Sequence, residues 1–160
     1  MYEVQINSES LEGVNLEAIK QYLRTEGCDA EDALLESQIK TAIKRAENYC
    51  NRTFTKKSIT VTSDLHEFAL LGMLDEVVKV TLDNNEVTAN YEVIGRKNPK
   101  FIASIAGTWA VTFTTIFDMP PEVEEFVRQS IYKMYERGEA NIPEPDHSVI
   151  KPYKRMIWLV

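Results

Sequence analysis

Apolar residues recur every three or four positions in three stretches of the chain, which predicts amphipathic helices there. The first helix is expected over residues 15–24, with Asn15 as its N-cap. The second is expected over residues 29–50, and the third over residues 120–138, where a Pro-Pro pair suits a first helical turn. The buried stripe of the second helix consists of Leu35, Ile39, Ala42, Ala46 and Cys50.

The region between the second and third helices alternates apolar and polar residues instead, which is the period of half-buried strands. Asn and Asp residues around position 84 predict a turn, because they tolerate left-handed backbone angles. The expected strands cover residues 58–62, 66–71, 77–82, 91–94, 101–105 and 109–115. Short strands joined by short turns favour a small antiparallel sheet.

The order of these elements predicts an α+β fold: a small helical bundle with an inserted antiparallel β-sheet or barrel-like subdomain. Residues 1–57 are expected to supply the N-terminal helices and residues 58–118 the β insertion. Residues 119–160 would form the long helix and a C-terminal tail, packing with residues 1–57 as one helical domain.

Charge and cysteine content narrow the classes of function. A net charge of -7 over 160 residues argues against a surface built throughout to hold nucleic-acid phosphates. The acidic start of the chain does not resemble a signal peptide, and no apolar run is long enough to span a membrane. Cys28 and Cys50 lack metal or redox spacing, so we expect a reduced, cytoplasmic chain.

No catalytic, cofactor-binding or metal-binding motif is present in the sequence, so the protein is not expected to be an enzyme. His66 and His147 lie far apart, and neither has ligand spacing around it. Two short clusters of lysine and arginine, near residues 52–57 and 96–100, could touch phosphate, but such clusters are typical of solvated turns.

Acidic residues gather before the second helix, at Glu26, Asp29, Glu31 and Asp32. Carboxylates at a helix N-terminus complement the helix dipole, and this structural interpretation is favoured. The alternative is a small enzyme with a carboxylate site here.

The chain closes on an apolar run that contains Ile157, Trp158 and Leu159, preceded by Tyr153 and Arg155. Trp, Tyr and Arg are enriched at protein interfaces, so these five residues are hypothesised to bind a partner. The run could also pack on the chain's own core or on a neighbouring subunit. If it is an interface arm, deleting residues 149–160 should spare the fold.

Several segments taken together resemble the phage head–tail connector (adaptor) family. Residues 16–24 form a short helix that ends in Tyr-Leu-Arg, followed by an acidic turn and a long helix whose end contains Glu-Asn-Tyr-Cys-Asn-Arg. Residues 132–138 and Pro152-Tyr153-Lys154-Arg155 are similar to the family's later elements. The resemblance covers roughly residues 14–155, in a variant with a β insertion before the last long helix.

The resemblance implies a non-enzymatic structural protein of a phage or prophage virion, assembled in the host cytoplasm. Such connectors form a homo-oligomeric ring below the portal protein, extend the channel used in DNA packaging, and bind the tail or a stopper protein. DNA would pass through without specific binding, and no membrane or cofactor is involved. The subunit interface is hypothesised to use helix residues Leu35, Ile39, Tyr49, Phe126 and Tyr135. The alternative is another phage tail-completion or terminator subunit.

Overall fold

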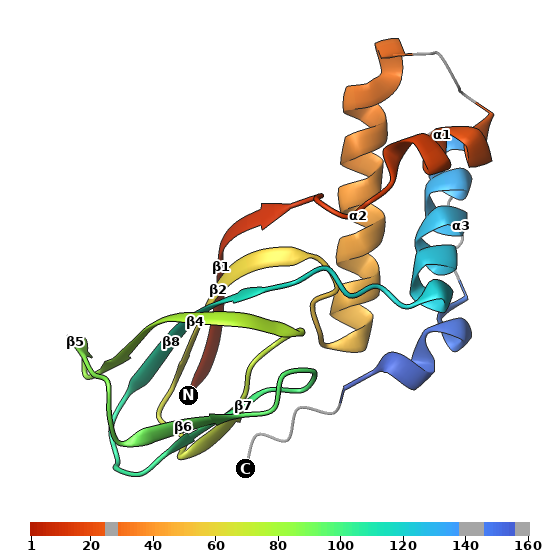
Figure 1. Ribbon diagram of the computed structural model, residues 1–160. Coiled ribbons are helices and arrows are strands. Elements are labelled where there is room, and N and C mark those ends of the chain that lie inside the picture. Colours follow the sequence, from red (N-terminus) through yellow and green to blue (C-terminus); the bar gives the residue numbers. More distant parts are fainter. Residues whose placement is uncertain (25–28, 138–145, 156–160) are drawn as a thin grey trace. The chain divides into compact units, whose positions relative to one another are not determined.

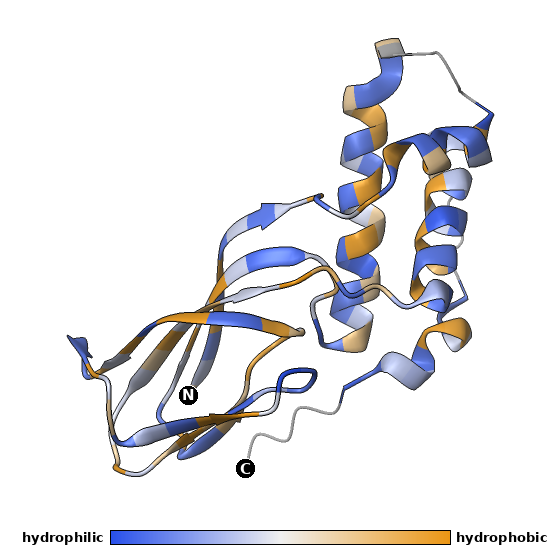
Figure 2. Ribbon diagram, in the orientation of Figure 1, coloured by the Kyte–Doolittle hydropathy of each residue, from blue (hydrophilic) through white to orange (hydrophobic). Residues whose placement is uncertain are grey.

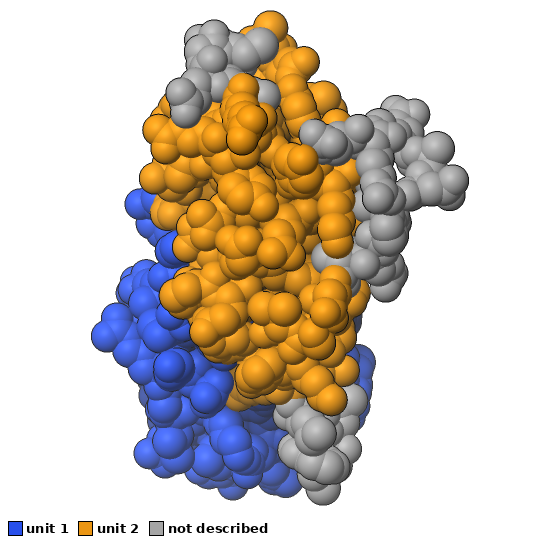
Figure 3. All heavy atoms as spheres, turned by 90° about the vertical axis from the view of Figure 1, so that its right-hand side faces the viewer, with its two compact units in different colours: residues 1–12, 52–118, 156–160 blue, residues 13–51, 119–155 orange. Residues whose placement is uncertain are grey.

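The computed structural model describes residues 1–24, 29–137 and 146–155 of the chain (Figure 1). The described residues form two compact units, which are coloured separately in Figure 3. The sheet unit contains residues 1–12 and 52–118, and the helical unit contains residues 13–51 and 119–155. Each unit is built from two stretches of chain that are distant in sequence.

The helical unit is built on three α-helices among its described residues. These are α1 (Leu16–Leu23), α2 (Asp32–Cys50) and α3 (Pro121–Arg137), with short 3-10 turns η1 (Asp29–Glu31), η2 (His147–Val149) and η3 (Lys151–Tyr153). Helix α3 packs against both α1 and α2. Figure 2 shows the alternation of apolar and polar residues along α2 and α3 that this packing requires.

The helix ends follow local chemistry. Asn15 caps α1 as predicted, because its Oδ1 accepts a hydrogen bond from the Ala18 N–H at 3.0 Å. The second helix, expected over residues 29–50, begins later than predicted, because residues 29–31 form η1 and the α-helix begins at Asp32. A 3-10 turn satisfies some of the unpaired N–H groups of a helix start without a side-chain cap.

The sheet unit contains eight strands among the described residues. They are β1 (Tyr2–Ser10), β2 (Lys56–Ser63), β3 (Glu67–Ala69), β4 (Leu74–Leu82), β5 (Asn85–Glu86), β6 (Tyr91–Ile94), β7 (Lys100–Ala103) and β8 (Trp109–Thr115). One sheet has the order β1-β2-β8-β4-β5 and the other has the order β3-β7-β6, with every pairing antiparallel.

Period-two alternation builds the core between these two sheets. Along β8, Trp109, Val111 and Phe113 are buried, whereas the residues between them are half exposed. The sheets share one apolar cluster, which contains Ile59, Val61, Phe68, Leu70, Val80, Phe101, Ala103, Trp109, Val111 and Phe113. Opposed sheets with such a core define a sandwich.

These observations confirm the α+β class and correct two finer expectations. In the described residues the sheets are open and do not close into a barrel. Residues 2–10, placed by the domain prediction within an N-terminal helical segment, form β1 and pair with β2 (Figure 1). The alternation of Tyr2, Val4 and Ile6 with polar residues is the signal that could have located this strand.

Candidate interaction surfaces

The segment from Asp146 to Arg155 is fixed on the helical unit. Ile150, between η2 and η3, is fully buried, and its carbonyl oxygen accepts the Cys50 thiol at 3.6 Å. A buried aliphatic side chain contributes about 1.5–3 kcal/mol through the apolar area that it removes from water. Deleting residues 149–160 would therefore damage the helical unit, as expected if this part of the chain packs on its own core, one of the alternatives that the sequence left open.

The end of this segment is held by the last turn of α2. The Arg155 N–H donates to the Cys50 carbonyl at 2.7 Å, and the Asn51 side-chain amide donates to the Arg155 carbonyl at 3.2 Å. Both bonds use groups that a helix end leaves unpaired or exposed. The main chain at residue 155 is consequently held against the C-terminus of α2.

Aromatic contacts hold the start of the segment. The His147 ring lies 4.5 Å from the Tyr49 ring and 5.4 Å from the Phe126 ring, measured between centroids. The Lys154 ammonium lies 5.0 Å from the Tyr49 ring centre, within the range of a cation–π contact. His147 thus has a packing role.

Two carboxylates accept hydrogen bonds from this segment. The Tyr153 hydroxyl donates to Glu122 at 2.6 Å, which lowers the pKa of Glu122 and raises the pKa of Tyr153. Asp146 accepts the Ser148 N–H at 2.9 Å and caps η2, and this bond lowers the pKa of Asp146. Charge-assisted bonds of this kind favour the ionised carboxylates.

The hypothesised partner-binding residues therefore fall into two groups. Tyr153 and Arg155 belong to the anchored segment and make contacts within the helical unit. Ile157, Trp158 and Leu159 lie outside the described residues. The hypothesis stays open for these three residues, while the main chain just before them has a fixed position on the helical unit.

The hypothesised subunit-interface residues are placed differently from the expectation. Leu35, Ile39 and Phe126 are only 5%, 1% and 2% exposed, so these side chains are not available to a neighbouring subunit. Sequence periodicity identifies a buried stripe but does not tell which surface covers it. Tyr49 and Tyr135 are half-buried, and the Tyr135 hydroxyl donates to Glu31 at 2.9 Å.

The acidic cluster serves structural contacts where the structure describes it. The buried Lys20 ammonium lies 2.7 Å from Asp32, which links α1 to the start of α2. Glu31 accepts the hydroxyl of Tyr135 from α3. Glu26 lies outside the described residues. These contacts support the structural interpretation of the cluster rather than a carboxylate site.

The short basic clusters in the sheet unit have acidic partners nearby. Lys56 lies 2.9 Å from Glu12, and this contact lowers the pKa of Glu12 and raises that of Lys56. Lys100 lies 2.6 Å from Glu67. Paired surface cations present less positive potential to a polyanion such as DNA.

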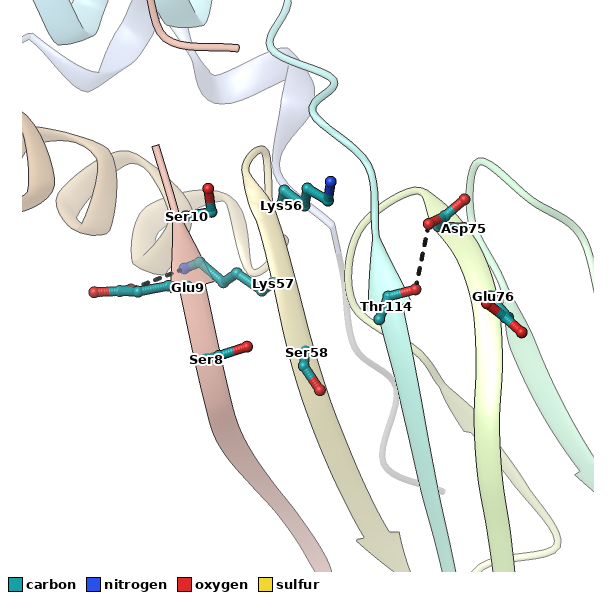
Figure 4. Close-up of a pocket in the computed structure, with 9 residues that line it drawn as sticks. All are labelled: Ser8, Glu9, Ser10, Lys56, Lys57, Ser58, Asp75, Glu76 and Thr114. Carbon is teal, nitrogen blue, oxygen red and sulfur yellow. Dashed lines mark hydrogen bonds and ion pairs between the residues drawn. The ribbon is translucent and has the colours of Figure 1, made fainter. Parts of the chain in front are cut away.

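A hollow of about 300 Å³ opens on the sheet unit, at the ends of β1, β2, β4 and β8 (Figure 4). Lys57 points toward Glu9, with 3.9 Å between the charged atoms, and Thr114 donates to Asp75 at 3.4 Å. Its lining residues are Ser8, Glu9, Ser10, Lys56, Lys57, Ser58, Asp75, Glu76 and Thr114.

The described residues contain no group of three or more His, Cys, Asp or Glu side chains placed to hold a metal ion. Within the same residues, none of the helices combines the length and the apolar character needed to cross a bilayer.

The fold is similar to that of chains in gene transfer agent particles. A chain from the neck of an empty gene transfer agent particle, computed with C6 symmetry, is 17% identical with a TM-score of 0.77, and the match covers 96% of both chains. A chain from the virion of a native gene transfer agent particle is 18% identical with a TM-score of 0.73, covering 96% of this chain and 95% of that one. No curated protein matches the sequence.

The sequence itself establishes the family. Residues 14–149 match the family model described as phage gp6-like head-tail connector protein. The chain belongs to this family, and the resemblance seen in its helical segments is thereby confirmed. It is a structural protein of the head–tail connector class.

Proposed function

We propose that this protein forms a ring between the head and the tail of a phage-like particle. The family match over residues 14–149 is the observation that carries this proposal. Support comes from the fold neighbours, which are parts of particle necks computed with C6 or C12 symmetry. A closed ring uses two different surfaces on each subunit, and this chain divides into two compact units.

In this proposal one side of the ring contacts the portal protein and the other contacts the tail or a stopper protein. The ring extends the channel through which packaged DNA passes, and subunits assemble in the host cytoplasm before joining the virion. The net charge of -7 suits a channel that does not retain DNA, because acidic surfaces repel phosphates.

Size measurement with and without a portal tests the assembly. Purified protein is mixed with the portal protein of the same particle and examined by native mass spectrometry and electron microscopy. A closed ring, either of the protein alone or only on the portal, is the expected result. Failure to bind the portal together with binding to tail-tube protein would instead favour a tail-completion or terminator subunit.

A DNA-binding measurement tests the channel. Linear duplex DNA is titrated into the assembled ring at low salt, where phosphate contacts are strongest. We expect no tight binding. Tight binding that weakens steeply with added salt would contradict a channel that DNA crosses without being held.

A further inference from the structure

The long edge strand β1 of the sheet unit leaves part of its backbone open to a partner strand. Among the described residues β1 has a single strand neighbour, β2, so one edge of its nine residues lacks a partner strand (Figure 1). The other edge strands, β3, β5 and β6, have only three, two and four residues. Strand β5 covers only Thr81 and Leu82 of β4, and the rest of that outer edge is protected by Lys79 and by two register shifts. Long edges invite pairing with another chain, and proteins protect them with charged side chains, Pro, β-bulges or extreme shortness. The pairing of β1 with β2 shifts register between Ile6 and Ser8, and Glu9 follows, so the open part of this edge is the segment 2–6, which contains no Pro and a single charged residue, Glu3.

This edge also exposes apolar side chains. Val4 pairs with Val61 and Ile6 pairs with Ile59, so Val4 and Ile6 point to the core face of their sheet. Unlike their buried partners, they are 37% and 51% exposed. A strand added beside β1 would cover them and extend the apolar face of the sheet by one strand.

The composition of the pentapeptide 156–160 suits a strand that would pair with the edge of β1. It reads Met-Ile-Trp-Leu-Val, five apolar residues rich in strand-forming types, and would extend about 17 Å as a strand. It follows a main chain that is fixed on the helical unit at residue 155. Residues 147–160 contain three basic side chains and no acidic one, whereas residues 1–19 contain four acidic and no basic side chains.

We propose that the pentapeptide 156–160 of one copy of this protein adds as a parallel strand to the free edge of β1 in a second copy. This contact rests on the proposed ring, in which each subunit gives its pentapeptide to one neighbour and receives one from the other. Such a donor–acceptor contact is heterologous and therefore compatible with closure into a ring.

Charge selects the direction and register. Glu3 is exposed and makes no ion pair among the described residues, and it stands on the polar face of β1 next to Val4. A parallel pentapeptide with Arg155 level with Glu3 brings Met156 beside Val4 and Trp158 beside Ile6, all on matching faces. An antiparallel strand over the same residues would move Arg155 away from Glu3 to the level of Asn7.

Disulfide cross-linking tests the contact, the register and the identity of the acceptor together. Val4→Cys and Met156→Cys are introduced into a Cys28→Ser background, and the protein is oxidised and separated on a non-reducing gel. We expect a ladder of covalent oligomers. The matched control, Ile6→Cys with Met156→Cys, should cross-link at least about tenfold less.

Each other outcome overturns a stated part of the proposal. A cross-linked product that runs as a monomer shows that β1 binds the pentapeptide of its own chain. A stronger ladder from the Ile6→Cys pair shows the antiparallel register. If neither cysteine pair cross-links, whether or not portal protein is present, the contact is rejected even if rings form. If a ladder forms but no ring is seen, the proposed ring is rejected and the contact is kept.

A peptide measurement gives the affinity. The probe is a synthetic peptide of residues 154–160, titrated by fluorescence anisotropy into a chain that ends at Arg155, so that the anchored segment is retained. Replacing the tryptophan of the peptide by alanine should weaken binding by about 30-fold, the scale of an interface hot spot. Glu3→Arg in the protein should weaken binding, and arginine-to-glutamate at position 155 of the peptide should restore it. No binding, or no effect of either change, contradicts the proposed contact.

Discussion

The two units of this protein are stabilised in different ways. In the sheet unit, one ring has a central place: Phe101 lies 4.9 Å from the Phe68 ring, 5.3 Å from Tyr91 and 5.3 Å from Trp109, between centroids. In the helical unit, amphipathic helices are completed by the separate segment 146–155, whose Ile150 is fully buried. The sheet unit thus depends on a dense aromatic cluster, and the helical unit depends on docking of a distant segment.

The difference shows where surfaces remain for partners. In the sheet unit, the middle strands have partner strands on both sides and bury their apolar residues. Strand β1 lies at the edge, and its apolar residues Val4 and Ile6 stay partly exposed. The helical unit covers its stripes internally, which removes Leu35, Ile39 and Phe126 from the set of interface residues. Its remaining exposed aromatic residues, Tyr22 and Tyr132, contact each other with 6.0 Å between ring centroids.

The largest effect is expected from Phe101→Ala, because it opens a cavity among three aromatic rings. The loss of stability of the sheet unit should be about 3–5 kcal/mol. In a Trp158→Phe background Trp109 becomes the single tryptophan, so its fluorescence during urea unfolding reports on the sheet unit.

The control for this variant is Ile105→Ala, since Ile105 is 41% exposed in the same unit. We expect a change within about 0.5 kcal/mol there. Circular dichroism at the helix band follows the helical unit in the same samples. An equal shift of the fluorescence and helix signals would show that the two units unfold together and would remove the distinction drawn above.

A second, smaller effect is expected from Ile150→Ala. Truncating this buried side chain should destabilise the helical unit by about 2–5 kcal/mol, measured by the helix signal. Val149→Ala is the matched control, because Val149 is the preceding residue and is 44% exposed. If both variants behave alike, the segment 146–155 does not contribute to the helical unit as its contacts indicate.

The smallest expected effect is a pH dependence of the helical unit. Glu122 and Asp146 have lowered pKa values in the folded protein, so the stability they contribute is present above their ordinary values of 4.5 and 3.8. It is lost as the pH falls from those values through the lowered pKa of each group. Both carboxylates are exposed, so solvent screening keeps the change small.

This dependence is measured as the urea midpoint of the helix signal between about pH 6 and pH 3. Tyr153→Phe removes the hydroxyl that donates to Glu122 and should flatten part of the acid-side decline. An unchanged pH profile in that variant would show that the Tyr153–Glu122 bond does not stabilise the segment.

Much of the fold follows from the sequence because its signals are local. The side chain of Asn15 and the apolar spacing after it specify α1 within a single turn of chain. The alternation at residues 109–115 specifies β8 and identifies its buried face. The order of helical segments also carried enough information to indicate the head–tail connector family, which the match over residues 14–149 confirms.

Only the tertiary structure decided which distant segments meet. Tyr2 pairs with Ser63 across the sheet, and Cys50 contacts Ile150 over a separation of 100 residues. The partner of an edge strand or of a buried stripe is set by long-range burial and hydrogen bonding, which leave no periodic trace in either segment alone. The periodicity of the sequence therefore identifies which faces of the helices and strands are apolar. Only the packing of the tertiary structure shows which of these faces are covered by other parts of the chain.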